Sequence, residues 1–205
     1  MKKQLEAVVL LKAVALFFEQ FLRYILLPQH VLHIDLKLRL TFLRALSYED
    51  FETVLPFIDP RSFPLKTVAT FSDPSTFDSQ IVKSAETLNL ILFTDQIVTV
   101  EDLKKLNNEK VIFERIRYFR IDIIPFIQYH IETKKVVETT FIISTDTKTF
   151  IDMMLREFEQ TFGEFQCDLD DVNERFLPGS SKFSIPINNE SRIQVYVIED
   201  PEEGD

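Results

Sequence analysis

The chain repeats a short unit, a helical segment followed by an apolar strand segment, and this repeat constrains its fold most strongly. Strand segments are predicted to begin near residues 33, 65, 88, 111 and 136. Their spacings of about 32, 23, 23 and 25 residues are typical of leucine-rich-repeat-like architectures. Helix-containing connections of this length favour parallel neighbouring strands. The sequence therefore predicts an α/β fold whose leucine-rich-repeat-like helix-strand repeats form an open, curved, mostly parallel sheet.

Several strand segments alternate between polar and apolar residues. "HIDLKLRL", from residue 33 to 40, alternates strictly, and polar residues take alternate positions in "LKTVATF" and "VVETTFII". Alternation is typical of a strand with one buried face. "LNLILF" is apolar on both faces, which fits a closed or doubly wound sheet instead. We favour the open sheet because most strands alternate.

The connecting segments carry helix start and stop signals. Ser47 with Asp50 forms an acidic variant of a capping box and predicts a helix up to Ile58. Pro56 would kink that helix, Asp59 suits a turn, and Pro60 ends the helix. "TVEDLKKL" predicts a capped helix, and "IPFIQYHIE" predicts another. In "VIFERIRYFRIDII" the strand could lie at 111–116 or at 118–123.

The end of the chain changes pattern. A helix is predicted at 147–162, with Phe150, Met154, Phe158 and Phe162 in one row and Gly163 as its C-cap. "KFSIPI" and "IQVYVI" then predict an antiparallel hairpin. These patterns predict that the whole chain has three parts: an N-terminal capping or connecting helix (1–31), a repeat domain (32–198) and an acidic disordered tail (199–205).

The N-terminal segment contains a long apolar run that charged residues interrupt. Glu6, Lys12, Glu19 and Arg23 leave no span of about 20 apolar residues, so an amphipathic or buried helix is favoured over a targeting or membrane segment. A form held at a membrane by this helix is a weaker alternative. With a single cysteine, Cys167, and no secretory pattern, we expect a cytoplasmic or nuclear protein.

Charge and composition argue against several functions. The net charge of −10 opposes binding to nucleic acid or to acidic membranes. His30, His33 and His130 do not have the spacing of a metal cluster, and three isolated glycines make no phosphate-binding loop. We therefore expect no metal, no cofactor and no enzyme activity. The alternative is a small-molecule hydrolase-type enzyme with an acidic site at Asp168, Asp170 and Asp171 near the C-terminal loop, joined by His130.

The order of several short motifs resembles one family, the FTH domain, an F-box-associated C-terminal domain expanded in nematodes. The run Leu55 to Pro60 followed by Leu65 and Lys66 is similar to a family motif. So are "QIVKSAETLNLIL" from Gln80, "VEDL" from Val100 and "FSIPINNESRIQV". Val82 and Ser84 stand near the places of a family tryptophan and asparagine. The resemblance covers roughly residues 32–198.

This resemblance implies a protein-protein interaction module, the substrate-recruiting part of F-box ubiquitin-ligase adaptors. In family members an N-terminal F-box docks on a Skp1-type adaptor, but no F-box is recognisable before residue 28. We therefore expect that adaptor as a partner only if an F-box is present elsewhere; the target protein is not specified.

Strand alternation predicts which residues line the exposed face of the sheet and bind a protein partner. They are Lys37, Arg39, Lys66, Thr70, Asn89, Ile91, Glu114, Glu138 and Thr140.

Overall fold

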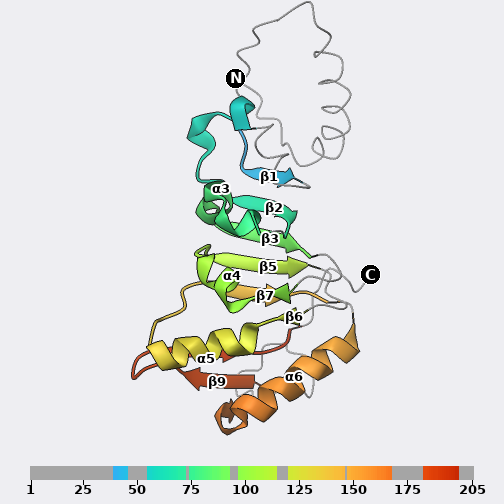
Figure 1. Ribbon diagram of the computed structural model, residues 1–205, viewed down its shortest axis with the longest axis vertical. Coiled ribbons are helices and arrows are strands. Elements are labelled where there is room, and N and C mark those ends of the chain that lie inside the picture. Colours follow the sequence, from blue (N-terminus) through green and yellow to red (C-terminus); the bar gives the residue numbers. More distant parts are fainter. Residues whose placement is uncertain are drawn as a thin grey trace, which may run out of the picture.

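The protein is described by a computed structural model, which covers residues 39–45, 55–72, 74–92, 97–114, 120–145, 147–167 and 182–198. Five strands form its main sheet: Phe42–Ala45 (β1), Thr67–Phe71 (β2), Thr87–Ile91 (β3), Lys110–Glu114 (β5) and Thr140–Ile143 (β7). All neighbouring pairs are parallel, and the strand order β1-β2-β3-β5-β7 follows the chain (Figure 1). The predicted α/β class and parallel sheet are confirmed. A doubly wound sheet would reverse its strand order instead.

Short helices alternate with these strands: Gln80–Ser84 (α3), Val100–Lys105 (α4) and Ile123–Thr133 (α5). Each begins thirteen residues after the preceding main-sheet strand begins, as shown by the pairs Thr67 and Gln80, Thr87 and Val100, and Lys110 and Ile123. Two further strands, Ile97–Val98 (β4) and Arg120–Ile121 (β6), pair in parallel just before α4 and α5. The chain thus repeats one strand-to-helix spacing three times.

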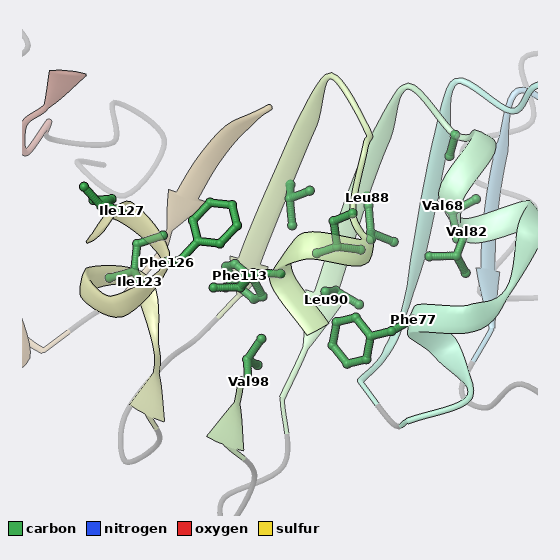
Figure 2. Close-up of a cluster of buried hydrophobic side chains, with 14 of the residues drawn as sticks. Val68, Phe77, Val82, Leu88, Leu90, Val98, Phe113, Ile123, Phe126 and Ile127 are labelled. Carbon is green, nitrogen blue, oxygen red and sulfur yellow. The ribbon is translucent and has the colours of Figure 1, made fainter. Parts of the chain in front are cut away.

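One face of the main sheet packs against the helices, and we call it the covered face. It carries two rows of side chains that the strand registers place side by side. The first row is Leu43, Val68, Leu88, Val111 and Phe141, and the second includes Thr70, Leu90, Phe113 and Ile143. Figure 2 shows Val68, Leu88, Leu90 and Phe113 of the strands with Phe77, Val82 and Phe126 of the helical layer. These side chains form the core.

The first strand and the segment after it differ from the prediction. A strand was predicted from residue 33 to 40, but β1 begins at Phe42, and residues 33–38 lie outside the described part. The backbone N–H of Leu40 donates to the hydroxyl of Ser62 (2.9 Å) instead of joining a strand ladder. Residues 47–54 also lie outside it, and where an α-helix was predicted to continue, Leu55–Phe57 (η1) is a 3₁₀ turn.

Proline and aspartate residues explain the backbone geometry of residues 55–62. Pro56 has no N–H to donate, and the N–H of Ile58 reaches only three residues back to Leu55 (3.1 Å). A second 3₁₀ turn, Pro60–Ser62 (η2), follows with Asp59 as its N-cap. The prediction of a turn at Asp59 is therefore confirmed.

The C-terminal elements are a long helix and a small sheet. They are Lys148–Phe162 (α6), Gly163–Phe165 (η4), Gln166–Cys167 (β8), Lys182–Pro186 (β9) and Arg192–Val195 (β10). The helix and the antiparallel hairpin of β9 and β10 were predicted and are confirmed. Gly163 ends the helix with a right-handed backbone (φ −56°) that continues into η4, so no left-handed cap forms. Phe158 and Phe183 belong to the same core cluster as the covered face.

The remaining predictions of elements divide in two. The ambiguous strand is resolved, because β5 occupies 110–114 in the main sheet and residues 120–121 form the separate strand β6. The predicted N-terminal helix (1–31) and acidic tail (199–205) lie outside the described residues. Within those residues, we find no helix with the length and apolar character needed to cross a membrane.

Candidate functional site

The main sheet has a second face, which we call the open face. Because side chains alternate along a strand, this face carries the residues between those of the covered face. They are Phe42, Arg44, Thr67, Ala69, Phe71, Thr87, Asn89, Ile91, Lys110, Ile112, Glu114, Thr140 and Ile142. All except Ala69 are exposed or half-buried. None of its apolar side chains belongs to the core cluster or packs against it.

Strand register orders these residues into rows that cross the sheet. One row is Phe42, Thr67, Thr87, Lys110 and Thr140. The next row is Arg44, Ala69, Asn89, Ile112 and Ile142, and a shorter third row is Phe71, Ile91 and Glu114. Ile112 and Ile142 therefore lie side by side on β5 and β7, whereas the first two rows carry only small or polar side chains over β2 and β3.

The acidic and amide side chains of the open face are bonded to each other. Asn89 Nδ2 donates a hydrogen bond to Glu114 Oε1 (2.9 Å), linking β3 to β5. Asn89 Oδ1 is shielded from solvent and has no hydrogen-bond partner among the described residues. This pair fixes the orientation of the Glu114 carboxylate and occupies one of its oxygens.

Two cations stand on the same face without such a partner. Arg44 on β1 and Lys110 on β5 are both exposed. Among the described residues, neither side chain has an ion-pair or hydrogen-bond partner. Exposed cations of this kind can pair with an acidic group from outside at little cost.

The predicted binding residues are only partly brought together. Asn89, Ile91, Glu114 and Thr140 lie on the open face, as predicted. Arg39, Lys66 and Glu138 are exposed but lie in segments before β1, β2 and β7.

Two of the predicted binding residues, Thr70 and Lys37, are not among those that the structure places on the open face. The prediction for Thr70 is wrong, because its side chain lies on the covered face with 0% exposure. Lys37 lies outside the described residues. Sequence reasoning missed Arg44, Lys110, Ile112 and Ile142. Lys110 and Ile112 share the alternation of Glu114, so the pattern that selected Glu114 could have identified them.

The alternative acidic site is not assembled in the described part of the chain. Asp168, Asp170 and Asp171 lie outside the described residues. His130 is buried on α5, where its Nδ1 donates to the carbonyl oxygen of Lys135 (2.8 Å) and its ring packs against Phe126. The described residues contain no group of three or more His, Cys, Asp or Glu side chains that could hold a metal ion.

Asp59 carries the one strongly shifted carboxyl group in the described residues. Arg61 donates to both of its oxygens, with Nη2 2.7 Å from Oδ2 and Nε 3.1 Å from Oδ1. These side-chain hydrogen bonds, with the backbone N–H of Arg61, lower the pKa of Asp59 from 3.8 to about 2. A carboxylate engaged in this way stabilises the turn before β2.

Comparison with known families identifies the part of the chain that holds the sheet. A family described as a domain of unknown function, DUF3557, matches residues 29–147. The chain belongs to the DUF3557 family. No curated protein and no solved structure matches the chain. The DUF3557 match contains all five strands of the main sheet and helices α3 to α5, so the whole open face belongs to this domain.

Proposed function

We propose that the chain is a non-enzymatic protein-protein interaction module that binds its partner on the open face of the DUF3557 sheet. One observation carries this proposal. Phe42, Phe71, Ile91, Ile112 and Ile142 share a face, outside the core cluster. Apolar side chains grouped on one surface and interspersed with polar ones are typical of protein interfaces.

We also propose that this sheet is leucine-rich-repeat-like. The repeated strand-to-helix spacing and the parallel strands in chain order support that interpretation. Contacts between neighbouring strand-helix repeats also support it: Asn108 Nδ2, just before β5, donates to the carbonyl oxygens of Val82 and Ala85 (both 2.7 Å). In repeat proteins of this kind the sheet lines an extended binding surface.

The helices of neighbouring repeats also contact one another. Lys105 of α4 pairs with Asp78 beside α3 (3.0 Å), and Lys104 Nζ lies 3.8 Å from the ring centroid of Tyr129 on α5. Each of these exposed contacts contributes little alone. Together with Asn108 they connect the neighbouring repeats that contain α3, α4 and α5, as expected of stacked repeats.

The resemblance to the FTH domain suggests the biological setting. We propose that the module recruits a target protein in the cytoplasm or nucleus, as the substrate-recruiting part of an F-box ubiquitin-ligase adaptor does. A Skp1-type adaptor would then join only through an F-box present elsewhere. The proposal requires no cofactor, metal, nucleic acid or membrane.

Affinity capture followed by quantitative mass spectrometry tests the proposal. The tagged chain is compared with Ile112→Asp on the open face and with Met153→Asp, an exposed apolar position on α6. A true partner should be recovered equally with the wild type and Met153→Asp, and at least tenfold less with Ile112→Asp. Circular dichroism should show that both variants are folded.

The same experiment can contradict the proposal at two levels. Equal recovery of every protein by all three chains would remove the open face as the binding surface. Recovery of an open-face partner without a Skp1-type adaptor would keep the interaction module and favour a binder that works alone.

A further inference from the structure

The charges of the open face differ in sign from those of the chain. The chain has a net charge of −10, yet the open face carries two cations, Arg44 and Lys110, and a single acid, Glu114. Glu114 already accepts a hydrogen bond from Asn89, whereas the two cations have no side-chain partner among the described residues. A basic patch in an acidic protein attracts acidic groups selectively, because the rest of the surface repels them.

The spacing of the two cations limits the shape of an occupant. Arg44 and Lys110 are three strands apart, and Arg44 stands one row further along the strands. With about 4.8 Å between strands and about 3.3 Å per residue along them, their Cα atoms lie about 16 Å apart. An extended segment covers that distance in about five residues.

The surface between and beside the cations is suited to such a segment. Thr87 lies between them and presents a small, half-buried side chain, which lets a backbone approach, and its neighbour Ala69 is small and buried. Ile112 and Ile142 lie beyond Asn89 in the row of Arg44 and can take apolar side chains. The backbones of β2, β3 and β5 pair with a strand on both sides, so an occupant of this face is held by side chains.

We infer that the open face binds an extended segment of a partner protein with two acidic residues four or six positions apart, the even spacings nearest that length, which turn both side chains toward the sheet, and with apolar residues between or beside them. One acid pairs with Arg44 and the other with Lys110. This inference rests on the proposed function and names the chemistry of the partner.

Peptide display on the folded full chain tests this inference. The probe is a library of random twelve-residue peptides, selected in parallel on four chains. These are the wild type, Ile112→Asp, the double variant Arg44→Glu/Lys110→Glu, and the double variant Lys148→Glu/Arg156→Glu on α6. The last variant makes the same change in net charge at exposed helix positions.

The expected result is specific for charge and position. The wild type and the α6 variant should enrich peptides with two acidic residues four or six positions apart. A selected peptide, measured by fluorescence anisotropy, should bind the Arg44→Glu/Lys110→Glu chain at least tenfold more weakly. Its affinity for the wild type should fall as salt is raised, because exposed ion pairs are screened.

Other outcomes separate this inference from the proposed function. Neutral or basic peptides that are lost with Ile112→Asp would overturn the acidic segment and keep the open face as a binding surface. If neither open-face variant changes which peptides are enriched, both this inference and the proposed function are overturned. A wild-type dimer in analytical ultracentrifugation that dissociates with Arg44→Glu/Lys110→Glu would identify a second copy as the occupant and overturn the inference.

Discussion

The two faces of the main sheet consist of alternate residues of the same strands, yet their environments differ sharply. Phe113 on the covered face is 0% exposed and stacks on Phe141, with ring centroids 6.4 Å apart. Its neighbour Ile112 on the open face is half-buried and lies outside the core cluster. Phe113 is therefore placed to stabilise the fold, whereas Ile112 is not needed for the core and can contact the partner that we propose. In this sheet, apolar character alone does not show whether a side chain belongs to the core.

The two faces also differ in how far their polar side chains are exposed to solvent. Thr70 on the covered face is fully buried, and its hydroxyl lies 3.4 Å from the carbonyl oxygen of Phe71. On the open face, Thr140 is exposed and can be solvated. Three pairs of substitutions and one series of pH values sharpen this comparison or break it.

The largest effect is expected for neighbouring substitutions in β5. Phe113→Ala removes a fully buried ring and should lower the free energy of unfolding by about 3–5 kcal/mol. Ile112→Ala removes a half-buried side chain outside the core and should cost about 1 kcal/mol or less. Urea denaturation followed by circular dichroism measures both. Equal losses would mean that the open face is part of the core, and the comparison would fail.

Two asparagines provide a polar version of the same test. Asn108→Ala leaves the carbonyl oxygens of Val82 and Ala85 without their buried donor and should cost about 2–3 kcal/mol. Asn89→Ala removes one hydrogen bond on the open face and should cost about 1 kcal/mol or less. Asn108 should also protect the turn before β5 from hydrogen exchange. A loss for Asn89→Ala as large as that for Asn108→Ala would contradict this assignment.

Local sequence patterns predicted much of the fold. Thr99 and Asp102 form a capping box, with each side chain bonded to the other residue's backbone, at the spacing that predicts one. Phe150, Phe158 and Phe162 are buried on one side of α6, as their periodicity predicts. In each case residues three, four or eight positions apart carry the signal, so neighbouring sequence is sufficient.

The candidate site was predicted less well, because it depends on strand register. A one-residue error in where a strand begins moves every side chain to the opposite face. In "LKTVATF" polar residues occur in both alternations, since Lys66 and Thr70 share one and Thr67 has the other. Nothing local decides between them; packing of Val68 and Thr70 against the helices does.

Contacts between distant segments could not be predicted at all. Asn108 bonds to residues 26 and 23 positions away, and no local pattern marks it. Arg44 was missed because the predicted first strand ended at residue 40, whereas β1 runs from Phe42 to Ala45. The sequence was therefore informative about features that depend on a single helix or turn. It was less informative about features that depend on contacts between neighbouring repeats.

A smaller effect is expected at the starts of the helices over the covered face. Thr99→Ala removes the side-chain cap of α4 and should cost about 1 kcal/mol. Ser79→Ala is the matched control, because Ser79 is the N-cap of α3 but its side chain makes no capping hydrogen bond. Thermal and urea unfolding should rank Thr99→Ala as the more destabilising. The opposite ranking would mean that the capping box does not hold α4 on the sheet.

The smallest effect is expected in the turn before β2, where pH tests a carboxylate that belongs to neither face. The pKa of Asp59 is lowered from 3.8 to about 2 by hydrogen bonds from Arg61, so the folded chain binds this proton less readily than the unfolded chain does. The associated stability is present above pH 4 and lost as the pH falls toward 2. Asp59→Asn keeps an N-capping side chain and removes the charge. Urea unfolding at a series of pH values should therefore show the wild type more stable at pH 7 and the difference shrinking between pH 4 and pH 2. A difference that stays constant over this range would assign the role of Asp59 to its hydrogen bonds alone.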